Sequence, residues 1–248
     1  MDRMIFLAMN GARQLELAQA VNTQNLANVS TTGFRADLAS VRALEIKGEG
    51  LPTRIYAVTE GETVDFSHGS ILTTGRELDI AVSGDGWIAV QGRDGTEAYT
   101  RAGDFRVSAS GQLETGVGHP VLGNDGPISV PPAETVTIGA DGTVSVRPLG
   151  QTASTLTVVD RIKLVNPPKE DLTKGADGLI RLRGEPGAVA DADIAVRVVS
   201  GSLESSNVNA IEAMVNMITL SRQFEMQIKG MKTAEEVDQA AVQLMRIG

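Results

Sequence analysis

Few side chains in this sequence have the type and spacing that catalysis or metal binding requires. The 248 residues include two histidines, His68 and His119, and no cysteine. Each histidine stands beside a turn residue, Gly69 or Pro120, with no second histidine or carboxylate at the spacing of metal ligands. We therefore interpret both histidines as solvated turn residues, and we expect no metal site and no thiolate chemistry.

Glycine and aspartate also occur in a pattern that could bind a nucleotide. Gly84-Asp85-Gly86 resembles part of a dinucleotide-binding loop, but Trp87–Val90 follows it with the pattern of a strand. A phosphate would need a helix N-terminus at that point. Asp-Gly pairs recur, and we expect each aspartate to bond its own tight turn. These pairs are Asp85-Gly86, Asp94-Gly95, Asp125-Gly126, Asp141-Gly142 and Asp177-Gly178. We expect no catalytic residue, no cofactor and no enzymatic activity.

Aromatic side chains suggest one alternative, a glycan-binding β protein. Trp87, Tyr56 and Tyr99 would supply the platforms on which sugars stack. Trp87, however, stands in mid-strand among alternating apolar residues, which favours a position in the core. Aromatic residues make up only 3% of the chain, which is sparse for a ligand-binding core and disfavours a small-molecule substrate.

Charge and hydropathy exclude two further classes of function. The net charge is −9 and the pI is about 4.8, whereas nucleic acids and anionic membranes attract basic patches. The sequence contains no run of 18 apolar residues, so we expect no transmembrane segment. The N-terminus lacks a basic stretch followed by an uninterrupted apolar core, so we expect no cleavable signal peptide.

The elements that would carry a function lie at the ends of the chain. The stretch from Asn209 to Ile247 holds no proline and opens with a capping box formed by Asn209 and Glu212. At 1.5 Å per residue, such a helix would be about 57 Å long. A three-four spacing predicts a coiled-coil seam that needs another helix along most of its length. The seam residues are Met214, Met217, Ser221, Phe224, Ile228, Met231, Glu235, Asp238, Val242 and Met245.

A second helix is predicted from Asp2 to Asn28, ending before a left-handed cap at Gly33. It repeats the three-four spacing with Met4, Ala8, Gly11, Leu15, Ala18, Asn22 and Asn25. Polar residues in such a seam specify register and partner rather than add stability. Two arrangements stay open: a helical hairpin tucked onto its own β domain, or a projecting pair that packs against further copies.

The middle of the chain differs from its ends. We expect an extended connector over 34–68, with short strands around Thr53–Thr59, and an all-β domain over 69–200 whose short strands suggest a barrel or sandwich. The predicted fold class is therefore mixed: two long terminal helices form a coiled-coil-like core domain, 1–33 with 201–248, and an all-β domain is inserted between them.

Three motifs resemble the rod and hook proteins of the bacterial flagellum. The first runs from Asn25 to Arg35, with Gln24 where the family has asparagine; the second is Tyr99–Phe105, followed by Gly111-Gln112-Leu113; the third opens at Ser205. The residues that carry the first and third motifs are Asn25, Leu26, Ala27, Asn28, Thr31, Gly33, Phe34, Ser206, Asn207 and Val208. Their order matches the family over essentially the whole chain. The opening residues and the length are most similar to the proximal-rod member, with a distal-rod or hook subunit as the alternative.

The resemblance implies a structural subunit of the basal-body rod, the helical drive shaft that transmits torque. It implies that the terminal helices pack in the inner core against other rod proteins and further copies, with the β domain outside. It also implies export through the flagellar type III apparatus, without a cleavable signal, into the periplasm. The expected assembly interface comprises Met4, Ala8, Gly11, Leu15, Ala18, Asn22, Asn25, Asn28, Met214, Met217, Phe224, Ile228, Met231 and Met245.

Overall fold

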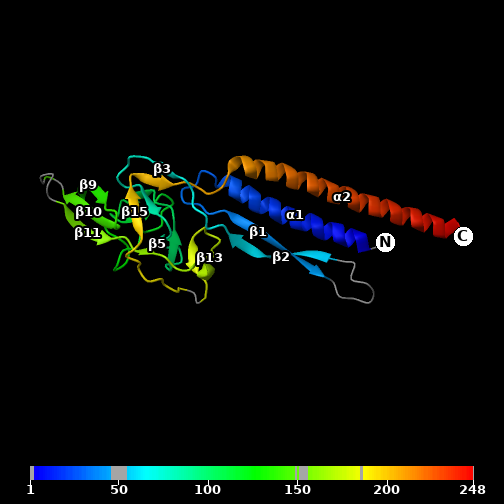
Figure 1. Ribbon diagram of the computed structural model, residues 1–248, viewed down its shortest axis with the longest axis horizontal. Helices are drawn as coiled ribbons and strands as arrows, with labels where there is room; N and C mark the ends of the chain where they lie inside the picture. Colours follow the sequence, from blue (N-terminus) through cyan, green and yellow to red (C-terminus); the bar gives the residue numbers. More distant parts are fainter. Residues whose placement is uncertain (1–2, 46–54, 149, 151–155, 185–186, 248) are drawn as a thin grey trace. The chain divides into compact units, whose positions relative to one another are not determined.

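The computed structural model describes residues 3–45, 55–148, 150, 156–184 and 187–247 (Figure 1). The chain divides into two units, which we describe separately. The helical unit comprises Met1–Asn28, Ala36–Asp65 and Val208–Gly248, and the β unit comprises Val29–Arg35 and Phe66–Asn207. The bounds predicted from the sequence, 1–33, 34–68, 69–200 and 201–248, remain predictions.

Two helices form the frame of the helical unit. Helix α1 (Arg3–Ala27) has 25 residues and helix α2 (Ala210–Ile247) has 38. The side chain of Asn209 accepts hydrogen bonds from the amides of Ile211 and Glu212, at 3.0 and 3.3 Å, so its predicted capping role is confirmed. These bonds satisfy donors that have no partner within the helix itself.

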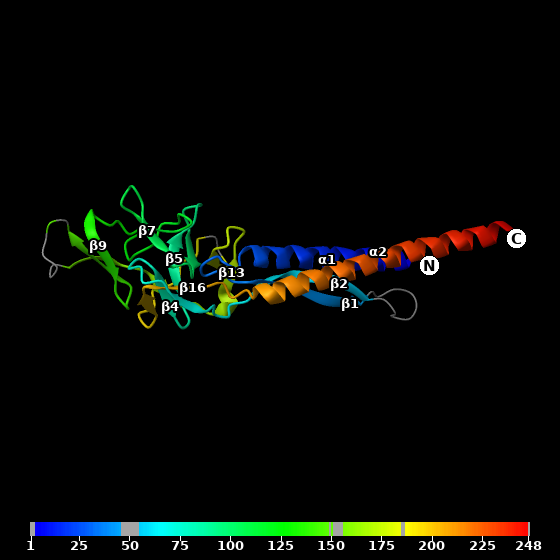
Figure 2. The ribbon, with the colours of Figure 1, turned by 90° about the horizontal axis from the view of Figure 1, so that it is seen from above.

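The two helices run antiparallel. The side-chain amide of Asn22 donates to the carbonyl of Ala213 at 2.8 Å, and a methyl group on Gly11 would lie 3.2 Å from the side chain of Gln227. The end of α1 therefore lies beside the start of α2, and earlier residues of α1 lie beside later residues of α2. Because α1 begins at Arg3, α2 continues past it from around Glu235 (Figures 1 and 2).

Helix α2 has one regular face of least exposed residues, which is turned toward α1 along the length that the two helices share. Its least exposed residues follow a four-three spacing: Ala213, Met217, Leu220, Phe224, Gln227, Met231, Ala234, Asp238 and Ala241. The predicted seam shares Met217, Phe224, Met231 and Asp238 with this face. The alternate positions of the predicted seam lie one residue away and are exposed, except for the half-buried Ile228.

A β-hairpin completes the helical unit. Strand β1 (Asp37–Glu45) pairs antiparallel with β2 (Ile55–Val64), Asp37 facing Val64, and both strands contact α1. Of the strands expected around Thr53–Thr59, residues 53 and 54 lie outside the described part of the chain. Helix α1 therefore packs against a sheet as well as against a helix.

The fold class predicted from the sequence is wrong in its central feature, because the helices do not form a long coiled-coil pair. Helix α2 is longer than α1 by 13 residues (38 − 25), so its far end has no α1 beside it. Four residues of the predicted α2 seam, Met214, Ser221, Glu235 and Val242, are exposed, and α1 divides its half-buried side between α2 and the hairpin. The broader expectation, two terminal helices flanking a β-rich middle, agrees with the structure.

In its described residues, the β unit consists of short strands and one turn of 3₁₀-helix. Strands β3 to β8 are Ile71–Thr73, Ile80–Ser83, Trp87–Gln91, Glu97–Thr100, Phe105–Val107 and Leu113–Thr115. Strands β9 to β12 are Ala133–Ile138, Thr143–Pro148, Thr157–Arg161 and Leu164–Val165. The 3₁₀-helix η1 (Lys169–Asp171) precedes β13 (Leu172–Lys174), β14 (Ile180–Leu182), β15 (Arg197–Ser200) and β16 (Ser202–Glu204).

These strands form several small antiparallel sheets. The largest has the order β12-β5-β6-β14-β13, a second has the order β11-β10-β9, and β15-β4, β16-β3 and β7-β8 are pairs. None of these described sheets closes on itself, so the described residues form open sheets around two apolar cores and not the barrel, which was one of the two architectures expected. The larger core includes Ile80, Val90, Phe105, Leu113, Val144 and Ile162, all nearly inaccessible to solvent.

The predicted bond between an aspartate and its own tight turn is confirmed for three of the five Asp-Gly pairs. Asp85 instead pairs with His68 at 3.3 Å and with Lys169 at 3.4 Å, and the bond of Asp125 stays a prediction. The side chains of Asp94, Asp141 and Asp177 accept hydrogen bonds from backbone amides two residues further on, at 3.1, 3.1 and 3.2 Å. The glycine after each aspartate has a positive φ of 80 to 85°. Glycine adopts this conformation without the steric cost that a Cβ brings.

Candidate assembly surface and its buried ion cluster

Helix α1 places its expected interface residues on the covered side of the helical unit. Ala8, Gly11, Leu15, Ala18, Asn22, Asn25 and Asn28 are all half-buried. Met4 belongs to α1, and its side chain lies outside the described part. The large apolar side chains that the described part of α1 exposes are Phe6, Met9 and Leu17.

Helix α2 exposes a longer apolar surface. Met217, Phe224, Ile228 and Met231 are half-buried, Met214 is exposed, and the side chain of Met245 lies outside the described part. Next to Met214, the residues Ile211, Val215 and Ile218 are spaced by four and three positions and therefore share one face. We call Ile211, Met214, Val215 and Ile218 the outer stripe. Ile211 is 75% exposed and Val215 is 56% exposed.

The sequence interpretation included Met214 but missed Ile211, Val215 and Ile218, because two apolar rows lie one position apart on α2. The first row begins at Ala213 and Met217 and faces the helical unit, while the second begins at Ile211 and faces solvent. A helix with two apolar rows is not satisfied by one neighbour. The spacing of Ile211, Val215 and Ile218 was the available signal.

Two asparagines of α1 in the predicted seam form hydrogen bonds that hold α1 to β1 and to α2. Asn25 donates to the carbonyl of Asp37 at 2.7 Å and accepts from the amide of the same residue at 2.9 Å. Asn22 bonds the first turn of α2, as described above. A groove of about 330 Å³ lies beside these contacts, bordered by α1, β1 and α2. The asparagines therefore set register inside the unit, whereas Asn28 bonds locally to the carbonyl of Gln24 at 2.9 Å.

The first and third family motifs meet within the β unit. The amide of Gly33 donates to the carbonyl of Glu204 at 2.8 Å, and the amide of Asn207 donates to the carbonyl of Phe34 at 3.4 Å. Lys174 donates to the carbonyl of Arg35 at 2.8 Å, with its ammonium group 4.0 Å from the centre of the Phe34 ring. Segments that are far apart in the sequence thus run side by side.

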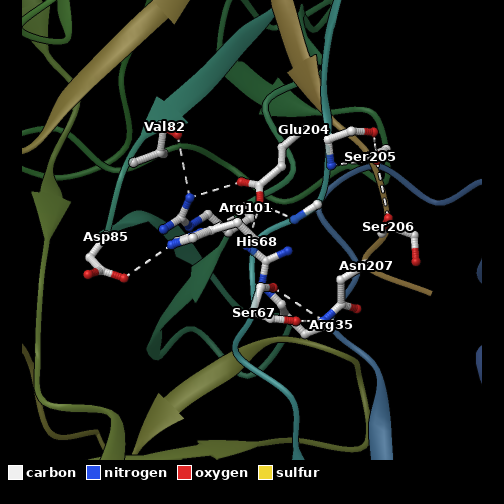
Figure 3. A network of polar contacts seen from close by, with 12 residues as sticks. Arg35, Ser67, His68, Val82, Asp85, Arg101, Glu204, Ser205, Ser206 and Asn207 are labelled. Atoms are coloured by element: carbon white, nitrogen blue, oxygen red, sulfur yellow. Dashed lines mark hydrogen bonds and ion pairs between the residues drawn. The ribbon is translucent and has the colours of Figure 1, made fainter. Parts of the chain in front are cut away.

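A buried ion cluster joins these segments to the second motif (Figure 3). One carboxylate oxygen of Glu204 accepts from Arg35 at 2.6 Å and from the amide of Gly69 at 2.9 Å, and the other accepts from Arg101 at 2.9 Å. The three charged side chains are each only 2% exposed. Both guanidinium groups also lie over the ring of Trp87, 5.7 and 5.3 Å from its centre.

Electrostatics keep Glu204 ionised in this cluster. Burial by itself would raise the pKa of the carboxyl, but the charges of Arg101 and Arg35 outweigh burial and hold that pKa below its usual range. Burial lowers the pKa of Arg101 by disfavouring its charged form. The first and second family motifs contain Arg35 and Arg101, but the sequence did not predict Glu204, because no local pattern marks a buried acid whose partners are more than 100 positions away.

The histidines and the aromatic residues that could have served metal or sugar binding differ in their exposure. The side chain of His68 is 44% exposed, as predicted, and lies 3.3 Å from Asp85, a carboxylate that the sequence did not place there. His119 is buried, so its prediction as a solvated residue is wrong; a tight turn packs it into the β unit. Trp87 and Tyr99 are buried and offer no surface on which a sugar could stack. The side chain of Tyr56 lies outside the described part.

Comparisons with known proteins identify the relatives of this chain. The model described as "Flagellar basal body rod FlgEFG protein C-terminal" matches residues 199–244, and "Flagellar hook protein FlgE/F/G D1 domain" matches residues 81–146. Flagellar basal-body rod protein FlgF of Escherichia coli K12 is 45% identical over 249 residues, which covers 99% of each chain. FlgF of Salmonella typhimurium LT2 is 44% identical over 249 residues, with the same coverage.

A rod protein with a different name matches at lower identity. Flagellar basal-body rod protein FlgG of Buchnera aphidicola subsp. Schizaphis graminum is 30% identical over 259 residues, covering 97% of this chain and 98% of that protein. Neither helix in the described part has an apolar stretch sufficient to span a lipid bilayer. With nearly full-length matches to rod proteins, this chain belongs to the family of flagellar basal-body rod proteins.

Proposed function

We propose that this structural subunit of the proximal flagellar rod joins other rod proteins, and further copies of itself, through the outward faces of α1 and α2. The outer stripe of α2 is the observation that carries the proposal. It is a continuous apolar surface on one face of a helix, and the family model of the C-terminal region spans nearly all of that helix. A rod is built from many subunits, so helices of neighbouring subunits are the partners that fit this surface.

Burial of the outer stripe would strongly favour association. Fully burying an aliphatic side chain contributes about 1.5–3 kcal/mol, so Ile211, Val215 and Ile218 together offer several kcal/mol before the cost of association. The end of α2 beyond Glu235 adds a second requirement. An isolated helical end gains little stability in water unless a neighbour packs against it.

We also propose that the protein leaves the cytoplasm through the flagellar type III export apparatus and assembles in the periplasm. The motif resemblance supports this route, and a sequence of 248 residues without cysteine suits an oxidising compartment. Cell fractionation of a strain with an inactive export apparatus tests the route. The protein should then stay in the cytoplasm, and its appearance in the periplasm of that strain would contradict the proposal.

A matched pair of lysine substitutions tests the role of the outer stripe. Val215→Lys places a charge in the stripe, and Val158→Lys places the same charge at a 64% exposed valine of β11 in the β unit. Both valines are exposed, so neither change should alter the stability of the isolated monomer by more than about 0.5 kcal/mol. Only Val215→Lys should abolish incorporation into purified basal bodies and swimming in soft agar.

Two results would refute the proposed role of α2. One is normal incorporation of Val215→Lys. The other is an equal loss for Val215→Lys and Val158→Lys, because that would mean that any new surface charge disturbs the rod.

A further inference from the structure

The chain passes between its two units through a small number of segments of the β unit. These are the segment 29–35, the segment that begins at Phe66, and the segment that ends at Asn207. Anything that holds all three segments together fixes where the chain enters and leaves the β unit. The buried cluster around Glu204 does so.

Each of the three segments contacts Glu204 or contains it (Figure 3). Arg35 from the first segment donates to the carboxylate at 2.6 Å, and Gly69 from the second donates its amide to the same oxygen at 2.9 Å. Glu204 itself lies in the third segment. Its backbone carbonyl also accepts from Gly33 at 2.8 Å, so the first segment is held twice.

Arg101 ties this carboxylate to the interior of the β unit. Its guanidinium donates to the second oxygen of Glu204 at 2.9 Å, to the carbonyl of Gly84 at 2.7 Å and to that of Val82 at 3.5 Å. Val82 and Gly84 belong to β4 and to the turn that follows it. The three connecting segments therefore share one attachment to a strand of the larger core.

Further bonds reinforce the same three segments. The side-chain amide of Asn207 donates to the carbonyl and the hydroxyl oxygen of Ser67, both at 3.2 Å. The amide of Ser205 donates to the carbonyl of Ser70 at 2.8 Å. A methyl group on Gly69 would lie 2.0 Å from the carbonyl oxygen of Ser205, so the second and third segments approach as closely as glycine permits.

Stability alone does not account for a buried cluster of two arginines and one glutamate. Desolvation of buried charges is costly, and well-packed apolar replacements of such clusters are often neutral or stabilising. The Nε atoms of Arg35 and Arg101 and the Nη1 atom of Arg35 have no hydrogen-bond partner among the described residues, which adds to that cost. Directional bonds, by contrast, specify a single arrangement of the segments that meet there.

We propose that Glu204 is a positioning hub: it fixes the three segments that connect the β unit with the helical unit in one register, so that the helices are presented for assembly. This inference rests on the proposed assembly role of the helices. Glu204 makes no contact with a partner in this role and acts through the segments that it holds.

Hydrogen exchange of the isolated monomer tests the hub directly. Glu204→Gln keeps the shape of the side chain and removes its charge. Amides in 29–35, 66–70 and 202–207 should together exchange at least 10-fold faster, whereas peptides of β5 and β6 should exchange as in the wild type. Exchange that rises only in 202–207, or rises equally in β5 and β6, would overturn the inference, because either result describes an ordinary structural residue.

Glu97→Gln provides the matched control. Glu97 pairs with Lys163 at 2.9 Å, and both side chains are largely buried, but neither residue lies in a connecting segment. This control should leave exchange in 29–35 and 202–207 unchanged. Faster exchange there in Glu97→Gln would mean that the connecting segments respond to any lost buried charge, and the hub would be refuted.

A variant without the three buried charges separates the positioning role of the cluster from its contribution to the stability of the β unit. The triple substitution Arg35→Met, Arg101→Met, Glu204→Leu leaves no unpaired charge. Its β unit should melt at or above the wild-type temperature, its connecting segments should exchange faster, and its incorporation into basal bodies should fall at least 10-fold. Wild-type incorporation, or wild-type protection of the segments, would overturn the hub.

The hub and the proposed function fail in different ways. If Val215→Lys assembles normally, then assembly through α2 is wrong, while the exchange experiments on the monomer still judge the hub. If Val215→Lys fails to assemble and the triple variant assembles like the wild type, then the hub alone is wrong.

Discussion

Replacement of Gly33 by alanine should destabilise the β unit by about 2–5 kcal/mol. Gly33 has a φ of 66°, and a Cβ there would lie 2.3 Å from the carbonyl carbon of Arg101 and 2.4 Å from the nitrogen of Ala102. Alanine in a left-handed conformation costs about 1–2 kcal/mol. Crowding of a packed region costs about 1–3 kcal/mol more, because backbone atoms cannot rotate away as a flexible side chain can.

Gly75→Ala is the control that isolates the crowding. Gly75 has a φ of 75°, and its Cβ would have no atom within 4 Å, so only the conformational cost of about 1–2 kcal/mol applies. Urea unfolding followed by the fluorescence of Trp87, the only tryptophan, measures both variants in the β unit. Equal losses of stability for Gly33→Ala and Gly75→Ala would refute the close approach between the first two motifs.

Three further predictions concern single contacts. Asn25→Ala should cost about 1–3 kcal/mol and speed exchange of the Asp37 amide, which loses its acceptor; unchanged exchange of that amide would contradict this. Tyr99→Phe should lower the stability of the β unit by about 1–3 kcal/mol in urea, because the amide of Ala190 donates to the Tyr99 hydroxyl at 2.7 Å and would lose that acceptor; a neutral variant would refute this role. The pKa of the Glu204 carboxyl is lowered in the folded state. The ionised carboxylate therefore stabilises the folded protein above the ordinary glutamate pKa of about 4.3, and this stabilisation is lost as the pH falls from that value through the lowered pKa. Urea midpoints between pH 3 and 6 should therefore fall less steeply in Glu204→Gln than in the wild type, and equal slopes would contradict the assignment.

Local signals predicted the two helices and the tight turns. The Asn209 cap needs only an oxygen within reach of two nearby amides, and the Asp-Gly turns need only a short polar side chain before a glycine. These interactions join residues within a few positions of each other. Their physics is therefore contained in a short window of sequence.

The arrangement of the helices could not be predicted in the same way. Two apolar rows on α2 differ by one position, and only the packed structure shows that Met217 faces inward while Ile218 is exposed. The hairpin of β1 and β2 gives α1 a second neighbour, which breaks the expected helix-to-helix seam. Pairing of Glu204 with Arg35 and Arg101 spans 169 and 103 positions, beyond the reach of any local pattern.

Crosslinking in assembled basal bodies tests the central claim most directly. The chain has no native cysteine, so a single introduced cysteine reports one position. With a short thiol-to-thiol linker, and the neighbouring rod proteins carrying cysteines on their own terminal helices, Ile218→Cys should join this subunit to a neighbour. Ser110→Cys, in the exposed turn between β7 and β8, should give no such product. Crosslinks from Ser110→Cys and none from Ile218→Cys would contradict assembly through the outer stripe.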